Sequence, residues 1–196
     1  ILCNKIYLLL IKLAGLANLL YVCYFKTMAV HLAIDGYNLT GVMTMPGQTA
    51  TDLEGTREEL IKRLQAYKRL KGHRITVVFD GKRSGSFYRA RMNQSGIEVV
   101  FSKDGEEADQ ILKEMAKKEM HGITIVTSDR AVVSFAEACG AVAIPSDEFD
   151  EILSMAIYSD MKGVTDEEED MPARQTGNPR RLSKQERKRL QRIKKL

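Results

Sequence analysis

The sequence predicts an α/β fold in which a central, mostly parallel β-sheet is covered by helices on both faces. Short apolar runs rich in β-branched residues alternate along the chain with amphipathic stretches of helical length. The runs are apolar throughout, which is typical of strands buried on both faces, and the stretches between them are long enough for right-handed helical crossovers. The expected strands, in chain order, are Val30 to Ile34, Ile75 to Phe79, Ile97 to Phe101, Ile123 to Thr127 and the weaker Ala141 to Ile144.

Helices are expected between these strands because apolar residues recur there at three- and four-residue steps, the period of a helix with one buried face. A chain of 196 residues is long enough for one such domain with appendages, and too short for two ordinary domains. Neither GxGxxG nor the phosphate-loop motif GxxxxGK occurs, so no nucleotide cofactor is expected. The expected helices are Arg57 to Lys71, Glu106 to His121, Ala131 to Ala138 and Asp147 to Ser159.

Residues 1–27 form an apolar extension outside the expected domain of residues 28–160. The stretch from Ile6 to Phe25 is nearly long and apolar enough to span a membrane, although a lysine and an asparagine would lie within the span. Met28 directly precedes the first expected strand. We therefore expect residues 1–27 to lie upstream of the true start, with a membrane anchor as the alternative, and we expect no membrane partner.

Residues 161–196 are expected to form an acidic linker followed by a basic tail. From Arg174 to Leu196 the chain carries ten Lys or Arg residues and one acid, Glu186, so this segment has a net charge of +9 and the rest of the chain −5. A basic tail on a slightly acidic body suits a polyanionic partner such as RNA, and a merely solvated tail is the alternative. A short helix is expected from Ser183 onward.

The three cysteines show no spacing suited to a structural metal. Cys3 and Cys23 lie in the N-terminal extension and Cys139 lies in an expected helix, with no CxxC motif and no His-Cys pair at zinc-ligand spacing. We therefore expect a reducing, cytoplasmic location and no structural zinc.

Four aspartates lie at or near the ends of the expected strands. Asp35, Asp80 and Asp129 follow the first, second and fourth strands, and Asp109 follows the third by one helical turn. In an open parallel sheet the carboxyl ends of the strands meet at one edge, so the four side chains are expected to converge there. Their mutual repulsion favours a hard divalent cation such as Mg²⁺ or Mn²⁺, which can activate a water for phosphodiester cleavage. The pattern therefore predicts a metal-dependent nuclease.

Each of these aspartates has an alternative role, because an Asp that follows a strand often only caps the next helix. Asp129 directly precedes a helix and is the one best suited to capping. Asp35 is the one least suited, because Gly36 follows it with unusual backbone freedom and Asn38 could orient a phosphate or a metal-bound water. Glu106 is a secondary candidate ligand, since it is expected to share a helix face with Asp109.

Four fragments in this order resemble the YacP-like NYN domain family, relatives of the PIN nucleases. The fragments are IDGYNLTG, VVFDG, GIEVVFSKDGEEAD and IVTSDRAV, and the resemblance covers roughly Ala29 to Tyr158. The C-terminal run NPRRLSKQERKRL also resembles the basic tails common in that family. It implies a PIN-like three-layer sandwich and endoribonuclease activity, with some members acting on RNA in a ribosomal context. Carried onto matching positions, it implies Asp35, Asp80 and Asp109 as principal metal ligands, Asp129 as completing the site and Asn38 as assisting.

A segment after Asp80 interleaves cations with two aromatic residues, an arrangement typical of surfaces that bind single-stranded nucleic acid. The alternative is a helix that buries Phe87. A non-catalytic RNA- or ribosome-binding module is the alternative function, whereas a phosphorelay receiver would need an acid pair and a lysine that are not found. The residues expected to bind RNA are Lys82, Arg83, Phe87, Tyr88, Arg89 and Arg91 in this segment and Arg180, Arg181, Lys184, Arg187, Lys188 and Arg189 in the tail.

Overall fold

The computed structural model describes residues 29–43, 53–81, 87–162 and 183–196. The expectations for residues 1–27, for Lys82 and Arg83, for the acidic linker beyond residue 162, and for Arg180 and Arg181 fall outside these ranges. Within the described ranges, no helix is both long and apolar enough to cross a membrane.

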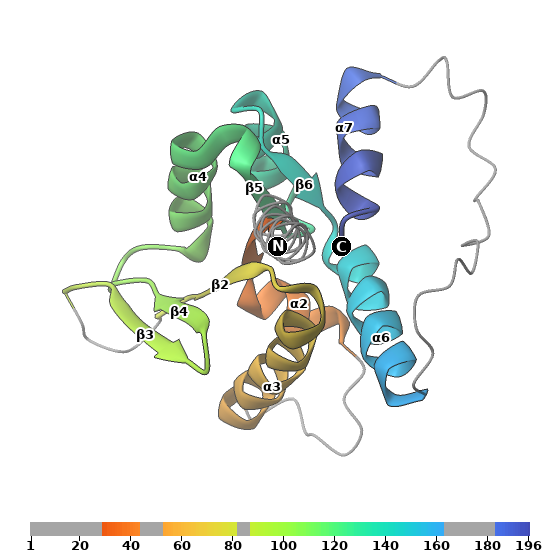
Figure 1. Ribbon diagram of the computed structural model, residues 1–196. Helices are drawn as coiled ribbons and strands as arrows, with labels where there is room; N and C mark the ends of the chain where they lie inside the picture. The colour runs from red at the N-terminus through yellow and green to blue at the C-terminus, as the bar shows by residue number, and fades with distance from the viewer. Residues whose placement is uncertain (1–28, 44–52, 82–86, 163–182) are drawn as a thin grey trace, which may run out of the picture.

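A six-stranded sheet with the order β3-β4-β2-β1-β5-β6 forms the centre of the domain (Figure 1). Every pairing is parallel except that of β3 with β4, so the predicted mostly parallel sheet is confirmed. The chain adds strands on one side of β1 and then crosses to the other side with β5, which makes the carboxyl end of β1 a point where the strand order reverses. The strands are β1 His31–Asp35, β2 Arg74–Phe79, β3 Ala90–Gln94, β4 Ile97–Phe101, β5 Ile123–Val126 and β6 Val142–Ile144.

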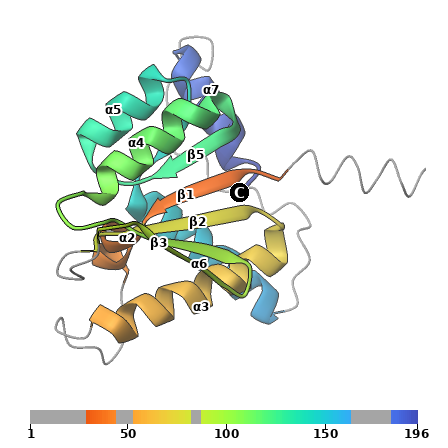
Figure 2. The ribbon, with the colours of Figure 1, turned by 90° about the vertical axis from the view of Figure 1, so that its left-hand side faces the viewer.

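Helices cover both faces of the sheet, which gives the three layers predicted from the sequence. Figure 2 shows α4 and α5 on one face and α3 with α6 on the other, while α7 lies at the side of β6. The helices are α2 Gly36–Val42, α3 Leu53–Lys71, α4 Ala108–Glu119, α5 Arg130–Ala138, α6 Ser146–Lys162 and α7 Lys184–Ile193, with a 3-10 turn η1 Met120–Gly122 after α4.

The alternation of side chains along each strand divides the core into two clusters. Ala33 and Val78 point to the face covered by α4 and α5, where they pack against Leu112 and other residues of those helices. Ile34 and Val77 point to the opposite face and belong to the larger cluster under α2, α3 and α6. The central strands are therefore buried on both faces, as their continuous apolar sequence predicts.

The antiparallel edge strand β3 was not predicted. Its sequence ARMNQ has no apolar period, and each of its residues is exposed, so burial leaves no signal there. The strand forms because Ser95 and Gly96 make a two-residue turn with φ values of 50° and 87°, which reverses the chain into β4.

Two helix boundaries differ from the prediction in ways that matter for the site. A short helix, α2, begins directly after Asp35, where no helix was expected. In addition, α4 begins at Ala108 rather than Glu106, so the expectation that Glu106 and Asp109 share a helix face is wrong. Glu106 lies in the turn between β4 and α4, where its backbone N–H donates to the oxygen of Lys103.

The last part of the basic tail packs on the domain instead of extending from it. The helix predicted after Ser183 is confirmed as α7, with Ser183 and Glu186 forming a reciprocal capping box. After this helix the Leu196 side chain is 5% exposed and belongs to the larger core cluster. The hydroxyl of Tyr67 donates to the Leu196 backbone oxygen at 2.9 Å, and the Nε2 atom of His73 lies 3.1 Å from the Lys195 backbone oxygen. These buried contacts attach the end of the chain to α3 and the start of β2.

Candidate active site

Asp35 lies at the carboxyl end of β1, and its side chain is held by two hydrogen bonds. Its Oδ1 accepts from the backbone N–H of Asn38 at 3.0 Å, and its Oδ2 accepts from the hydroxyl of Thr127 at 3.3 Å. The first bond makes Asp35 the N-cap of α2, so the prediction that Asp35 is the aspartate least suited to capping is wrong. The residue is only 9% exposed.

Burial raises the pKa of the Asp35 carboxyl, and the negative charges of Asp109 and Asp80 raise it further. The hydrogen bonds from Asn38 and Thr127 act in the opposite direction, because they stabilise the ionised form. An ionised Asp35 is therefore held in place by donors while neighbouring carboxylates repel it.

Gly36 is required by close packing rather than by unusual dihedral angles. Its φ is not in the left-handed region, so the backbone freedom that the sequence suggested as the reason for a glycine is not used. A Cβ at this position would overlap the ring of Phe79, which ends the neighbouring strand β2. The missing side chain thus allows β1 to turn into α2 directly beside β2.

Asp80 follows β2 and connects that strand to the start of α4. Its Oδ1 accepts from the backbone N–H of Ala108, the first residue of the helix, at 2.6 Å. Gly81 then passes so close to the backbone of Ser102 that no Cβ fits, and its N–H donates to the Ser102 hydroxyl at 2.9 Å. These contacts fix Asp80 at the same edge of the sheet as Asp35.

Asp109 lies in the first turn of α4, one residue after the N–H that binds Asp80. Burial raises the pKa of its carboxyl, and the charges of Asp129 and Asp80 add to the rise, while Lys113 opposes it. Among the described residues, no hydrogen bond involves the Asp109 carboxylate. Of the four aspartates, Asp109 is therefore the one that interacts with the other described residues through charge alone, without a hydrogen bond.

Asp129 caps α5, as its sequence position predicts. Its Oδ1 accepts from the backbone N–H groups of Ala131 and Val132 at 2.7 and 3.0 Å. Its own backbone N–H donates to the Thr127 hydroxyl at 3.2 Å, so the same hydroxyl contacts both Asp35 and Asp129. Thr127 was not singled out from the sequence, although it stands in the fragment IVTSD between a buried strand and an acid.

Asn38 is oriented by donors from two other elements. Its Oδ1 accepts from the backbone N–H of Ser128 at 3.0 Å and from the hydroxyl of the buried Ser146 at 2.7 Å. Because a backbone N–H can only donate, the amide oxygen faces these groups and the amide nitrogen is directed away from them. Ser146 begins α6, far from Asn38 in the sequence, and no local pattern indicated its role.

Glu106 is engaged by Arg89, which changes the expected role of both residues. The Nε and Nη2 atoms of Arg89 donate to the two carboxylate oxygens of Glu106 at 2.8 and 2.5 Å, and its Nη1 and Nη2 also donate to Glu114 at 2.7 and 2.8 Å. A carboxylate held by both oxygens in this way is poorly placed to coordinate a metal, and a guanidinium shared by two carboxylates is poorly placed to bind a phosphate. The structure thus favours neither the metal-ligand role that the sequence suggested for Glu106 nor the RNA contact that it suggested for Arg89.

The aspartates match a divalent cation in their chemistry. Asp35, Asp80, Asp109 and Asp129 offer hard oxygen donors at one edge of the sheet, where burial and, after it, neighbouring carboxylates raise the pKa of Asp35 and Asp109. Within the described ranges, however, no three acidic, histidine or cysteine side chains lie close enough together to form a metal site. The donor set fits the ion, and the side chains would have to move toward one another to hold it.

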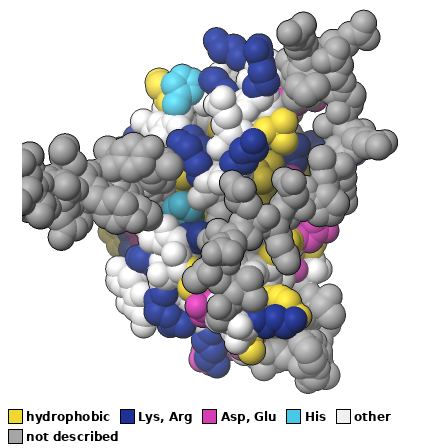
Figure 3. Space-filling view, turned by 45° about the vertical axis from the view of Figure 1, so that its right-hand side comes forward, with side chains coloured by type: hydrophobic (Ala, Val, Ile, Leu, Met, Phe, Trp, Pro, Cys, Tyr) yellow, Lys and Arg dark blue, Asp and Glu magenta, His cyan; other side chains and the backbone are white. Residues whose placement is uncertain are grey.

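The exposed residues expected to contact RNA lie at two places on the surface. Phe87 and Tyr88 are 85% and 81% exposed, so the alternative of a helix that buries Phe87 is wrong. Arg91 pairs with Glu98 at 3.0 Å on the exposed edge of the sheet. On α7, Lys184 and Arg187 are exposed, whereas Arg189 forms an ion pair with Glu148. Figure 3 shows Lys and Arg side chains distributed over one face of the molecule, with fewer acidic ones.

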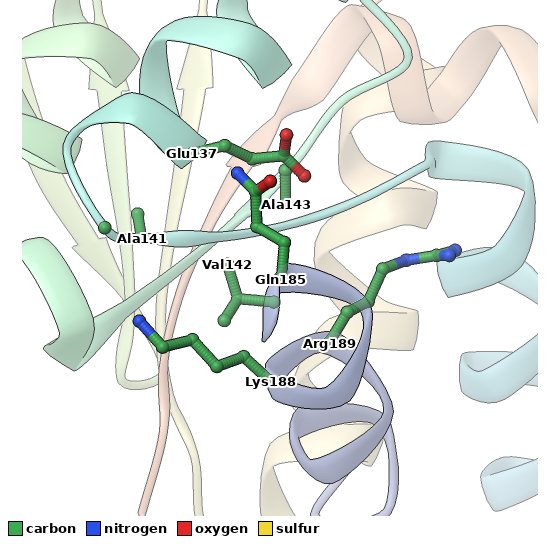
Figure 4. A pocket seen from close by; sticks show the side chains of 8 residues that line it. Glu137, Ala141, Val142, Ala143, Gln185, Lys188 and Arg189 are labelled. Atoms are coloured by element: carbon green, nitrogen blue, oxygen red, sulfur yellow. The ribbon is translucent and has the colours of Figure 1, made fainter. Parts of the chain in front are cut away.

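A small pocket lies away from the aspartates, between α7 and the start of β6 (Figure 4). Its wall includes Val142 and Ala143 of β6 together with Gln185 and Lys188 of α7, and the Glu137 side chain points across it. It lies at the opposite end of β6 from the carboxyl edge, so it is separate from the candidate active site.

Comparison with known proteins identifies the family. The model of the family described as YacP-like NYN domain matches residues 32–195, which include α7 as well as the sheet. The chain belongs to this family. YacP-like NYN domains are part of the PIN-like nuclease superfamily, consistent with an RNA-related function. The resemblance predicted from the four sequence fragments is therefore confirmed, and the match also includes the basic C-terminal run, as expected.

Relatives from Bacillus subtilis agree with this assignment. The protein described as uncharacterized protein YacP is 31% identical over 87 residues, which cover 44% of this chain and about half, 51%, of that relative. The crystal structure of Rae1 (YacP) from the same organism, in a variant with one Trp-to-Leu substitution, superposes with a TM-score of 0.57 at 24% identity and covers 68% of this chain and 80% of that one. A second Rae1 (YacP) structure gives a TM-score of 0.53 at 24% identity over 68% and 78% of the two chains. These structures support the PIN-like fold of this YacP-like NYN domain.

Proposed function

We propose that this YacP-like NYN protein is a cytoplasmic, metal-dependent endoribonuclease. The observation that carries the proposal is the buried Asp35, whose ionised form is repelled by Asp109 and Asp80 at the carboxyl edge of the sheet. Gathering several carboxylates at one edge of the sheet is unfavourable unless a cation compensates for their charge. Family membership in the PIN-like superfamily supports the same interpretation.

In this proposal Asp35, Asp80 and Asp109 would hold Mg²⁺ or Mn²⁺, with Asp129 completing the site. The bound ion would supply a water of lowered pKa and neutralise charge on the phosphodiester. Thr127 holds the Asp35 carboxylate through its hydroxyl. The Asn38 amide nitrogen, which is directed away from Ser128 and Ser146, would donate a hydrogen bond to a phosphate oxygen.

RNA would be held by surfaces around this edge and on the tail. Phe87 and Tyr88 offer exposed rings for unpaired bases, and Lys82, Arg83 and Arg91 offer charge for the backbone. The tail, from Arg174 to Leu196, has a net charge of +9 and would add sequence-independent affinity for RNA or for ribosome-bound RNA.

The test compares the full chain with its Asp35→Asn variant on single-stranded and structured RNA, with and without ribosomes, in Mn²⁺, Mg²⁺ or EDTA. Asn keeps an oxygen that can accept from the Asn38 N–H, so the substitution removes the charge and preserves the cap of α2. We expect cleavage to need the metal and to fall by at least about 100-fold in the variant, because a ligand to the ion contributes several kcal/mol to the transition state. Asp160→Asn, an exposed acid near the far end of α6, is the matched control and should cleave normally.

A non-catalytic RNA- or ribosome-binding module is the second candidate. The capping hydrogen bonds favour it, because a backbone N–H donates to each of Asp35, Asp80 and Asp129. These aspartates would then stabilise the fold without taking part in any reaction. Under this alternative the wild-type chain binds RNA, cleaves none in any metal, and shows no difference in thermal stability between Mn²⁺ and EDTA. Cleavage that continues in EDTA and in Asp35→Asn would contradict the metal-dependent mechanism.

A further inference from the structure

A group of three charged side chains lies beside the candidate active site, and we call it the Arg89 clasp. It consists of Arg89, which precedes β3, Glu106, which precedes α4, and Glu114 on α4. The guanidinium donates two hydrogen bonds to each carboxylate, at distances between 2.5 and 2.8 Å. Charge-assisted bidentate pairs of this kind are directional, so they fix the backbone of Arg89 against α4.

The clasp is not a phosphate-binding group. It contains one positive and two negative charges, and the hydrogen bonds from Arg89 lower the pKa of both carboxyls, so both stay ionised. A phosphate that approached Arg89 would have to displace a carboxylate of Glu106 that is almost fully buried. The arginine that the sequence placed among the RNA contacts is thus engaged within the protein.

The clasp fixes the segment that carries the most exposed aromatic ring of the described chain. Phe87 is 85% exposed and stands two residues before Arg89. Ala90, the next residue, pairs with Phe101, and Phe101 also pairs with Phe79, which directly precedes Asp80. Phe87 therefore emerges at the carboxyl edge of the sheet, the same edge that carries the aspartates.

An exposed phenyl ring at this edge offers its flat apolar face to a ligand that can stack on it. The proposed substrate supplies such a ligand, because each nucleotide presents a base next to its phosphodiester. Only an unpaired base offers its face to a side chain, since a base within a duplex is already stacked on its neighbours.

We propose that Arg89 is a positioning residue, and that the Arg89 clasp holds Phe87 as a stacking platform for an unpaired base beside the phosphodiester to be cleaved. This inference rests on the proposed function and narrows its substrate class to single-stranded RNA. Arg89 acts through Phe87 and makes no contact with the RNA backbone.

The chain contains no tryptophan, so Phe87→Trp introduces a single fluorescent reporter at the platform. Binding is measured in EDTA with a short oligouridine and with a blunt duplex, so the result does not depend on cleavage. We expect the oligouridine to quench the indole emission of the Phe87→Trp variant and the duplex to leave it unchanged. The matched control is Tyr158→Trp, an exposed aromatic position near the far end of α6, which should respond to neither RNA.

A double-mutant cycle separates positioning from direct contact. Phe87→Ala should weaken oligouridine binding by about 5-fold to about 100-fold, the range for loss of one stacked base. Arg89→Met should weaken binding similarly in the wild-type background and hardly at all in the Phe87→Ala background, because the two residues act as one unit. The slope of log affinity against log salt should stay unchanged in Arg89→Met, whereas loss of a phosphate contact would reduce it by about one unit.

Two further variants test whether the loss of binding comes only from a lost charge or from unfolding. Glu114→Gln removes only the exposed arm of the clasp and should give a smaller loss of binding with a native melting curve. Arg63→Met removes an arginine that pairs with Asp150 on the other face of the sheet, and its affinity should equal that of the wild type. Additive losses in the cycle together with a reduced salt slope would overturn the positioning role. Equal quenching by duplex and oligouridine, or unchanged binding in Phe87→Ala, would overturn the stacking platform, while cleavage measured separately in Mn²⁺ decides the proposed function.

Discussion

Two threonines, one in β5 and one directly after it, offer a matched pair of substitutions whose effects on the free energy of unfolding should have opposite signs. Thr124 and Thr127 are both fully buried, and valine has nearly the same shape as threonine. The Thr127 hydroxyl donates to Asp35 and accepts from the Asp129 N–H. The Thr124 hydroxyl has no hydrogen-bond partner in the described part of the chain. Thr127→Val and Thr124→Val therefore make the same chemical change in opposite environments.

The expected magnitudes follow from what each hydroxyl does. Thr127→Val removes two hydrogen bonds and leaves the part-buried Asp129 N–H without its acceptor, so it should lower the free energy of unfolding by about 2–3 kcal/mol. Thr124→Val removes an unsatisfied buried oxygen and adds a methyl group, so it should raise the free energy of unfolding by about 1 kcal/mol. For a chain of this size the two Tm values should then differ by roughly 10 °C.

The assay is thermal and urea unfolding of the two variants beside the wild type, followed by far-ultraviolet circular dichroism. If the chain cleaves RNA as proposed, Thr127→Val should also move the acidic limb of the pH–rate profile to higher pH, because the hydroxyl lowers the pKa of Asp35 and its loss lets that pKa rise. Equal destabilisation by the two substitutions would refute the reasoning, since it would mean that volume rather than hydrogen bonding controls both sites.

Two other predictions concern the buried histidines and the end of the chain. Burial lowers the pKa of His31 and His73 below 6.5, so the unfolded state binds protons more readily than the folded state. The free energy of unfolding should therefore be constant above pH 6.5 and fall as the pH drops below 6.5. His31→Gln should reduce this dependence of the unfolding free energy on pH, as measured by urea titrations at several pH values. A stability that rises as the pH falls below 6.5 would contradict the assignment. Leu196→Ala should lower the free energy of unfolding by about 2–5 kcal/mol because it empties a core position, whereas Leu190→Ala on the exposed side of α7 should change it by less than about 0.5 kcal/mol. Equal effects of the two leucines, measured by urea unfolding, would show that α7 is not docked.

The parts of the fold that could be predicted from the sequence are those that burial controls. The central strands around Ile34, Val77 and Val126 have continuous apolar sequences, and the structure pairs them in parallel as that pattern indicates. The edge strand β3 escaped prediction because its residues are exposed and its formation depends on the turn at Ser95 and Gly96. Local sequence period carries no information about a strand that buries neither face.

The candidate site was predictable in its acids and not in the groups that hold them. Strand ends indicated Asp35, Asp80 and Asp129, because topology alone brings such positions to one edge. The support from Ser146 reaches Asn38 across 108 positions of sequence, and that from Thr127 reaches Asp35 across 92. Partners so distant are determined by packing of the whole domain, which no window of the sequence contains. The same is true of Arg89, whose pairing with Glu106 and Glu114 could not be distinguished in sequence from a basic residue directed at RNA.

Capping and metal binding, which compete as explanations of an aspartate at a strand end, are compatible once the individual oxygens are considered. At Asp129 both backbone donors bind Oδ1, so the cap uses one oxygen of two. At Asp80 the bond from Ala108 also falls on Oδ1. Because a carboxylate oxygen has two acceptor sites, a cap can fix the orientation of the group and still leave acceptor capacity for an ion. The caps then set where each carboxylate lies relative to Asp109, and the repulsion between them is maintained by the backbone of α2, α4 and α5 rather than relieved by side-chain rotation. Under the proposed function, an ion would draw together carboxylates whose orientation is already limited by backbone hydrogen bonds, which reduces the entropic cost of ordering them.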